Sequence, residues 1–384
     1  MHSSTQLFTH SPTKMQIILP DLLCSWGYKG FLNPHYEGAK AESNTWIRPL
    51  VVKLFDERGQ KAFAKDYTGL LASMTYPHHN KEFLCVACDM MNLFFVYDEY
   101  TDITPPETAQ RLAKIVVNAM RNPDEIAALG EDSIGTMTKQ FWRRAMTLLP
   151  PNGCNSESCI QHFIDYTEEY LTAVTREACD RSSGSVHAVK DYLAMRRATS
   201  GAGLMVGLLE FGLDLPEEVM KHEVIQELST GAIDMYCLLN DMHSYASELS
   251  SGQASHNVIT VVMHERNLSL QEAFDWLASY AAGVVKGFKT NLNRVPSFSE
   301  LEDHSLHGEG MLRDRIQRYI DGLGQAVRAE DDWAFETTRY HGQNGPQIKL
   351  TRMLTIRPQV KDNYAKQAPR VEAPERPMLL EVRS

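Results

Sequence analysis

The sequence is poor in the features that define several large classes of protein. The 384-residue chain carries a net charge of −11 and has no stripe of Lys and Arg, so we expect no nucleic-acid partner. No apolar run reaches the roughly 20 residues that a membrane-spanning helix needs. The N-terminal residues lack the layout of a signal peptide. We therefore predict a cytoplasmic protein.

Cysteine is too scattered to organise the fold. The seven cysteines stand at positions 24, 85, 88, 154, 159, 179 and 237, and only Cys85 and Cys88 form a C-x-x-C pair. A zinc or redox site would need a second pair or a thioredoxin-like context, and the sequence has neither. The pair lies inside an apolar run, so we interpret both residues as small buried side chains.

The alternation of polar and apolar residues that predicts β-strands is missing as well. Apolar residues instead recur at helical spacing, as Trp46, Leu50 and Leu54 do. The fold class predicted is all-α. Helices are expected over residues 39–55, 60–74, 80–102, 107–121, 133–149, 157–179, 222–250, 257–290, 311–323 and 329–338.

The chain also lacks an internal linker rich in Gly, Ser or Pro between residues 30 and 340. We therefore expect a single domain over residues 18–342. Residues 1–17 are predicted to form a flexible N-terminal arm. Residues 343–384 are rich in proline and charge, and are predicted to form a disordered tail.

An acidic segment, Asp98-Glu99-Tyr100-Thr101-Asp102, ends the apolar helix predicted over residues 80–102. Asp98 and Asp102 lie one helical turn apart on the same face. Two carboxylates at this spacing repel each other by roughly 0.2–0.5 kcal/mol. A hard dication such as Mg²⁺ relieves that repulsion, and it binds one or two carboxylates together with water and phosphate oxygens. The alternative is a solvated helix end, since acidic residues are common at surfaces.

Three oxygen donors form a row on the helix predicted over residues 222–250. Asn240, Ser244 and Glu248 follow one another at intervals of four and span only about 80° of the helix circumference. An amide oxygen, a hydroxyl and a carboxylate together suit Mg²⁺. Polar residues at this spacing are common in helices, so the row alone is a moderate indication of a metal site.

Two basic segments accompany the oxygen donors. Arg196 and Arg197 precede a run of small residues, 199–203. Because each glycine weakens a helix by about 1 kcal/mol, this run predicts a helix interrupted beside a cavity or, alternatively, a tight helix–helix crossing. The second segment, Arg339-Tyr340, follows the last predicted helix.

In order and spacing, these four segments resemble the motifs of class I terpene cyclases. Residues 33–43, 89–102 and 240–248 are similar to sesquiterpene synthases of basidiomycete fungi, and within them to the subgroup with protoilludene-type products. The resemblance covers about residues 18–342. It implies a carbon–oxygen lyase folded as an α-helical bundle around a central apolar cavity.

The resemblance further implies that three Mg²⁺ ions hold the substrate diphosphate. Asp98 is expected to bind two of them, and Asn240, Ser244 and Glu248 the third. Asp102 completes the acidic motif and is also expected among the metal-binding residues. In such enzymes, however, it often accepts a hydrogen bond from an arginine in the closed state.

The diphosphate donors implied by the resemblance are Arg197, Arg339 and Tyr340. Arg196 is the alternative to Arg197. We prefer Arg197 because Ser200-Gly201 follow it at the offsets that the family uses. One departure from the family is Ser247, which stands where many relatives carry a lysine next to the glutamate of the second motif.

The catalytic residues are therefore expected to include Asp98, Arg197 and the aromatic wall residues Phe95 and Trp333. A carbocation must be kept from water, and aromatic faces attract cations by roughly 0.5–2 kcal/mol per contact. The alternative for both aromatic residues is an ordinary place in the core.

The expected reaction is ionisation of farnesyl diphosphate and cyclisation of the carbocation by 1,11 closure to a protoilludene-type hydrocarbon. A sesquiterpene cyclase with a different closure is the first alternative. A second alternative is a chain-elongating prenyltransferase, but this would need a second Asp-rich motif. A third is a non-catalytic helical binding protein, but such a protein would not need all the metal-binding residues to be present. The protein is expected to be a monomer or a homodimer.

Overall fold

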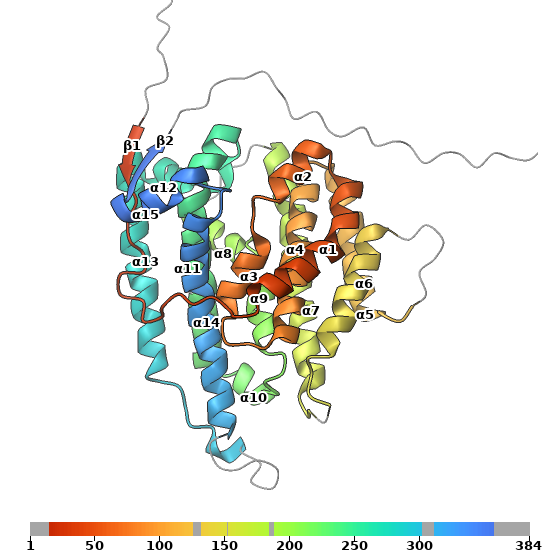
Figure 1. Cartoon of the computed structure of the whole chain (residues 1–384). Coiled ribbons are helices and arrows are strands. Elements are labelled where there is room, and N and C mark those ends of the chain that lie inside the picture. Colours follow the sequence, from red (N-terminus) through yellow and green to blue (C-terminus); the bar gives the residue numbers. More distant parts are fainter. Residues whose placement is uncertain (1–14, 126–131, 152, 184–187, 302–310, 357–384) are drawn as a thin grey trace, which may run out of the picture.

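The computed structural model describes residues 15–125, 132–151, 153–183, 188–301 and 311–356. Helices dominate this part of the chain and confirm the all-α class (Figure 1). The helices are α1 (Tyr36–Leu54), α2 (Glu57–Phe63), α3 (Thr68–Thr75), α4 (Lys81–Thr101), α5 (Pro106–Arg121), α6 (Ser133–Met146), α7 (Ser156–Ser183), α8 (Val189–Thr199), α9 (Ala202–Leu209), α10 (Glu217–Met220), α11 (Glu223–Ser251), α12 (Val258–Arg266), α13 (Leu270–Leu292), α14 (Met311–Glu336) and α15 (Gly345–Thr351). Three short 3₁₀ helices, Ala254–His256, Ser299–Leu301 and Gly342–Asn344, lie between them.

Helix α4 carries the acidic segment and packs against α1, α3 and α6. It begins at Asn80, whose side chain accepts a hydrogen bond from the backbone N–H of Phe83 and so caps the first turn. Nearly all of its residues between Phe83 and Tyr97 are buried. Neighbours cover most of its circumference, and its C-terminal end, with Asp98 and Asp102, lines the cavity described below.

Helix α11 carries the second motif and packs against α13 and α14, and α14 in turn packs against α3. Hydrogen bonds between buried side chains join α11 to α14 and to the segment that follows α14. His243 lies 3.0 Å from His341 through Nδ1 and 3.1 Å from Asp331 through Nε2. These contacts fix the segment after α14, which carries Arg339 and Tyr340, relative to the row of oxygen donors on α11.

The run of small residues after Arg197 does two things. Gly201 has φ +69°, a left-handed conformation that favours glycine, and it separates α8 from α9. Gly203 and Gly207 let α9 approach α7 closely, since a Cβ on either would lie within about 3 Å of Tyr166 or Phe163. The interruption and the tight crossing, posed as alternatives, therefore both occur.

The prediction for the C-terminal region was wrong over residues 343–356. Helix α15 packs on α14, and strand β2 (Met353–Ile356) pairs antiparallel with β1 (Met15–Ile18), so that the two lie side by side (Figure 1). Leu354 and Ile356 are buried. The strand is only four residues long, which is too short for a clear alternation of polar and apolar residues. The flexible arm predicted over residues 1–17 is likewise wrong at residues 15–17, which belong to β1 and are held by pairing with β2. Residues 1–14 of that arm and residues 357–384 of the predicted tail lie outside the described residues.

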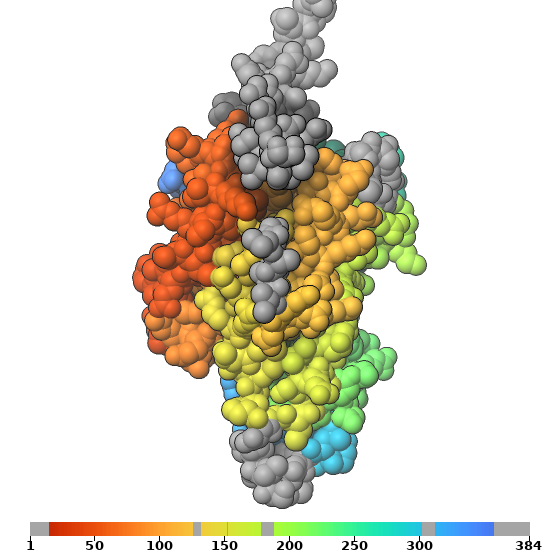
Figure 2. All heavy atoms as spheres, turned by 90° about the vertical axis from the view of Figure 1, so that its right-hand side faces the viewer, coloured from red at the N-terminus to blue at the C-terminus, as the bar shows by residue number. Residues whose placement is uncertain are grey.

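The face seen from the side of α5 and α6 is built mainly by the N-terminal half of the chain (Figure 2). The C-terminal segments reach only its margins in this view. Among the described residues, no helix combines the length and apolar character needed to cross a bilayer.

Candidate active site

A cavity of about 270 Å³ lies between α4, α7, α8, α9, α11 and the end of α14. All four motifs of the sequence contribute residues to its wall. The apolar part of the wall consists of Met90, Met91, Phe94, Phe95, Val174, Met195, Leu204, Met205 and Trp333. The polar part consists mainly of Asp98, Glu99, Asp102, Tyr170, Glu177, Tyr192, Arg196, Tyr236, Asn240, Ser244, Glu248, Arg339 and Tyr340. The cavity thus combines a wall suited to a hydrocarbon with one suited to a charged group.

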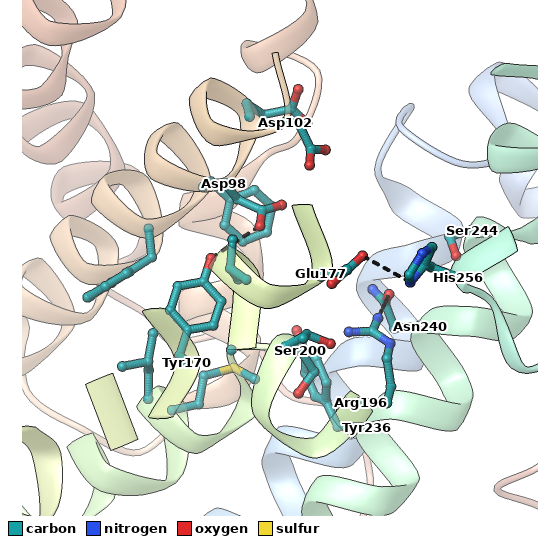
Figure 3. A pocket seen from close by; sticks show the side chains of 18 of the residues that line it. Asp98, Asp102, Tyr170, Glu177, Arg196, Ser200, Tyr236, Asn240, Ser244 and His256 are labelled. Carbon is teal, nitrogen blue, oxygen red and sulfur yellow. Dashed lines mark hydrogen bonds and ion pairs between the residues drawn. The ribbon is translucent and has the colours of Figure 1, made fainter. Parts of the chain in front are cut away.

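Asp98 and Asp102 both line the cavity, one helical turn apart at the end of α4 (Figure 3). The pKa of Asp98 is raised to about 8, first by burial and then by the negative charges of Asp102, Glu99 and Glu177. The hydroxyl of Tyr170 donates a hydrogen bond of 3.2 Å to Asp98. This end of the cavity therefore holds an excess of negative charge that a bound cation would relieve.

The row of oxygen donors lies across the cavity from Asp98 (Figure 3). Hydrogen bonds at both its oxygen and its nitrogen fix the orientation of the Asn240 side-chain amide. Its oxygen accepts a 2.7 Å hydrogen bond from Arg196, while its nitrogen donates hydrogen bonds of 3.0 Å to Glu330 and to the hydroxyl of Tyr340. The amide oxygen is consequently turned toward Arg196 and the cavity.

Ser244 and Glu248 continue this row. Glu248 accepts a 3.0 Å hydrogen bond from the amide of Asn257, which also lies 3.4 Å from the Ser244 hydroxyl. Burial and the nearby Asp241 raise the pKa of Glu248 to about 7. As at Asp98, the groups around Glu248 offset only part of the negative charge that its carboxylate carries when ionised.

The preference for Arg197 over Arg196 is corrected by their positions. Arg196 lines the cavity with a side chain that is 15% exposed, and it is held by Asp241 at 2.8 Å. Arg197 is absent from the cavity wall, and its side chain is 42% exposed and paired with Asp234. Consecutive residues of a helix point about 100° apart, so only one of the two can face the cavity. The family offset did not identify which one.

Arg339 and Tyr340 both line the cavity, as expected. The guanidinium of Arg339 is 2.9 Å from the carboxylates of both Asp66 and Glu99. Tyr340 is held by Asn240. Arg339 is therefore already oriented by two carboxylates at the edge of the cavity.

The two predicted aromatic wall residues contact each other. The rings of Phe95 and Trp333 are perpendicular, with centroids 6.1 Å apart, and the guanidinium of Arg339 lies 5.7 Å from the centre of the Phe95 ring. Trp333 is fully buried, and its indole N–H donates a 2.9 Å hydrogen bond to the carbonyl of Asp66. Both rings belong to the core and to the cavity wall at once.

The donor chemistry of this cavity fits hard divalent cations. Asp98, Asp102, Asn240, Ser244 and Glu248 offer carboxylate, amide and hydroxyl oxygens. Within the part of the chain that the structure describes, no three His, Cys, Asp or Glu side chains converge on one point. Water and substrate oxygens would therefore have to complete the coordination of any ion, as Mg²⁺ sites commonly require.

Several cavity residues were not predicted. Tyr170 and Glu177 of α7 face Asp98 and the second motif, respectively, and Glu177 lies 3.8 Å from His256 (Figure 3). Tyr236 precedes Asn240 by one turn on α11, so the helical period could have identified it. Ser247, the departure from the family, is partly buried and does not line the cavity.

Comparison with known proteins identifies the family of this chain. Residues 89–286 match the model of terpene synthase family 2, C-terminal metal binding. A sesquiterpene synthase-like protein of Cyclocybe aegerita is 59% identical, with 90% of this chain and 94% of the relative covered. A sesquiterpene synthase of the same fungus is 44% identical, with 92% and 95% covered. A Delta(6)-protoilludene synthase of Stereum hirsutum is 40% identical, with 89% and 88% covered.

Solved structures agree at the level of the fold. A cucumene synthase variant superimposes with a TM-score of 0.68 at 22% identity, with 82% of this chain and 100% of that chain covered. An α-eudesmol synthase gives a TM-score of 0.67 at 21% identity, with 82% and 98% covered.

Proposed function

Because this chain belongs to the terpene synthase family and is a fungal class I sesquiterpene synthase, we propose that its substrate is farnesyl diphosphate and that it closes the resulting carbocation between C1 and C11. The observation that carries the proposal is the placement of both oxygen-donor motifs on opposite walls of one cavity whose remaining wall is apolar and aromatic.

The resident ions are proposed to be three Mg²⁺. Asp98 and Asp102 hold two of them, and Asn240, Ser244 and Glu248 hold the third. When bound, they supply Lewis-acid stabilisation for the negative charge that develops on the departing diphosphate. The raised pKa values of Asp98 and Glu248 support this assignment, since burial of carboxylates without counter-charge is costly.

Three side chains are proposed to donate hydrogen bonds to the diphosphate: Arg196, Arg339 and Tyr340. Arg196 replaces Arg197 in this role because it is the one that lines the cavity. Arginine presents several N–H donors in a fixed fork that matches phosphate oxygens. Fixed donors aimed at a leaving group stabilise the transition state more than donors that must first reorient.

The apolar wall is proposed to fold the C15 chain and to exclude water from the carbocation. Phe95 and Trp333 present aromatic surface in the same region as Arg339. Each cation–aromatic contact contributes roughly 0.5–2 kcal/mol. The two rings pack edge to face, so they present this aromatic surface to the cation from two directions.

The 1,11 closure to a protoilludene-type tricycle is supported by similarity to the protoilludene synthases of Stereum hirsutum and Armillaria gallica, at 40% and 37% identity. A different closure is the alternative, because the more similar Cyclocybe aegerita relative is described only as synthase-like. Chain elongation is disfavoured by the Asn/Ser/Glu composition of the second motif, and a non-catalytic role by the intact set of oxygen donors.

The test is incubation of the purified protein with farnesyl diphosphate, in parallel with Mg²⁺ and with EDTA, and analysis of the volatile products by gas chromatography–mass spectrometry. A Mg²⁺-dependent C15H24 hydrocarbon is expected, and its identity reports the closure. A third incubation adds isopentenyl diphosphate. Longer diphosphates there, without any hydrocarbon, would replace the proposal with chain elongation.

A further inference from the structure

The loop between α2 and α3 carries a buried aspartate that contacts two parts of the site without lining the cavity. Asp66 is 3% exposed and lies behind Arg339 and Trp333. A buried carboxylate is costly unless it is paired or hydrogen-bonded. Its contacts therefore indicate what it stabilises.

The side chain of Asp66 orients a diphosphate donor. Its Oδ1 lies 2.9 Å from one terminal nitrogen of Arg339, and Glu99 lies 2.9 Å from the other. Among the described residues, nothing donates a hydrogen bond to Oδ2 of Asp66. The carboxylate is thus committed to a single cationic partner, and it fixes the rotation of the planar guanidinium beside Phe95.

The main chain of the same residue fixes the aromatic wall. The carbonyl oxygen of Asp66 accepts hydrogen bonds from the indole of Trp333, at 2.9 Å, and from the hydroxyl of Thr337, at 3.3 Å. That hydroxyl also lies 3.3 Å from the backbone N–H of Arg339 and 2.8 Å from the carbonyl of Lys65. Trp333, Thr337 and Arg339 are therefore all positioned from one peptide segment.

The backbone after Asp66 is held in an unfavourable conformation. Tyr67 has φ +51°, in the left-handed region that non-glycine residues rarely occupy. Such conformations persist only where surrounding contacts determine them, and they cluster at functional sites. This turn is held by hydrogen bonds from Trp333 and Thr337 at the end of α14 to the carbonyl of Asp66, and by backbone hydrogen bonds from Leu70 and Leu71 to the carbonyl of Tyr67.

We propose that Asp66 is a positioning residue of the cyclisation reaction, which sets the Arg339 guanidinium and the Trp333 ring in one fixed arrangement. The inference rests on the proposed function, in which Arg339 binds the diphosphate and Trp333 faces the carbocation. Its consequence is that loss of the Asp66 charge frees the Arg339 guanidinium beside Phe95, which weakens diphosphate binding and opens this edge of the cavity to water, while the carbonyl that holds Trp333 is retained.

The chain offers a matched control in Asp89 on α4. Asp89 is fully buried and is paired with Arg144, and burial raises its pKa to about 6, as it does for Asp66. Neither Asp89 nor Arg144 lines the cavity. Asp66→Asn and Asp89→Asn therefore remove the same kind of charge pair, one behind the site and one away from it.

The experiment measures two properties of each variant. Calorimetry gives the affinity for inorganic pyrophosphate in the presence of Mg²⁺, and product analysis gives the share of farnesol, the water-quenched product. For Asp66→Asn we expect affinity to fall about tenfold and kcat/KM to fall about tenfold to a hundredfold, since small misplacements at a site have effects of this size. The farnesol share should rise. Asp89→Asn should lower the melting temperature and leave both properties within a factor of two.

Equal values for Asp66→Asn and wild type, or equal changes in the two variants, would overturn the inference. If Asp66→Asn does not fold, Thr337→Val decides. It removes the hydroxyl bridge while retaining Asp66, and it should weaken pyrophosphate binding about threefold; no change would count against the inference. A wild-type protein that makes no hydrocarbon would contradict the proposed function, whereas the pyrophosphate measurement reports on Asp66 without any turnover.

Discussion

At the scale of single residues, Arg196 and Arg197 are adjacent in the sequence but their side chains lie in different environments. Arg196 touches Asn240 and Asp241 at the cavity, and Arg197 pairs with Asp234 at a more exposed position. We predict that Arg196→Gln lowers kcat/KM for farnesyl diphosphate by roughly a hundredfold or more, because a fixed donor to the leaving group is lost. Steady-state assays of both single variants provide the comparison.

Arg197→Gln serves as the control for this prediction. It removes the same charge one residue away, so its kcat/KM should stay within a factor of three of wild type. A larger loss in Arg197→Gln than in Arg196→Gln would restore the assignment based on the family offset.

The metal motifs give a second prediction at this scale. Asp98→Asn and Asn240→Leu should each abolish Mg²⁺-dependent product formation, because each removes an oxygen donor from a different wall of the cavity. The stabilisation of the fold by Mg²⁺ with pyrophosphate should fall as well, since a ligand stabilises only the state that binds it. Thermal unfolding with and without these ligands measures this effect, and full turnover in either variant would contradict the assignment of the metal-binding residues.

Among the predicted residues that line the cavity, those of the two metal motifs follow a short repeat along one helix, whereas Arg339, Tyr340 and Trp333 were predicted from the family resemblance. The acidic pair at Asp98 and the row beginning at Asn240 follow the helical period. Tyr170 and Asp66 reach the site from separate elements, and no local spacing reports such contacts. The choice between Arg196 and Arg197 depended on a helix rotation that sequence alone left open.

At the scale of elements, the break between α8 and α9 depends on Gly201. Its left-handed conformation costs an alanine roughly 1–2 kcal/mol. A Cβ there would meet only Tyr170, at 3.7 Å, so strain rather than a clash is expected. We predict that Gly201→Ala lowers the free energy of unfolding by about that amount and also reduces turnover, since Ser200 and Gly201 line the cavity.

Gly231, inside α11, is the control for this prediction. A Cβ at this helical position would make ordinary contact with Phe288 at 3.6 Å. Gly231→Ala should therefore raise the free energy of unfolding by about 0.5–1 kcal/mol. Urea denaturation of the two variants measures both changes, and equal signs would contradict the explanation.

The C-terminal elements give a further prediction. Helix α15 is held by the ion pair of Lys349 with Asp332 at 2.8 Å and by the buried Ile348, and β2 buries Leu354 and Ile356. Removal of residues 345–384 should therefore lower the melting temperature much more than removal of 357–384. Differential scanning calorimetry of the two truncated proteins tests this prediction, and similar melting temperatures would show that α15 and β2 contribute little.

Composition misled the prediction for this region. Proline and charge are typical of disordered tails, but here Pro346 and Lys349 belong to the ordered helix α15. The strand β2 is only four residues long, and its partner β1 lies near the start of the chain. Long helices such as α4 and α11 were found because their pattern is repeated over many turns.

At the scale of the whole molecule, buried carboxyl groups make stability depend on pH. Burial raises the pKa of Asp98 to about 8 and those of Glu248 and Glu330 to about 7. Unfolded carboxyls titrate near 4, so from pH 8 to pH 6.5 the folded state takes up protons that the unfolded state does not. The free energy of unfolding of the metal-free protein should therefore rise as the pH falls through this window.

Urea denaturation at pH 8, 7 and 6.5 in EDTA measures this dependence. Asp98→Asn and Glu330→Gln should each flatten it, because the amides do not titrate. Below pH 6.5 the trend should weaken, since burial lowers the pKa of His79 to about 4 and of His341 to about 3, and the unfolded state then takes up protons at these two residues. Stability that increases with pH between 6.5 and 8 would contradict the prediction.

The pairing of β1 with β2 also has a consequence for synthesis on the ribosome. Strand β1 is made among the first residues of the described chain, and its partner among the last. Throughout translation β1 is an unpaired edge, and such edges favour aggregation. Contacts between distant parts of a chain also form slowly, because a long loop must close first. The two-stranded sheet can therefore close only after residue 356 has been made, and a chaperone that covers β1 until then should increase the yield of folded protein.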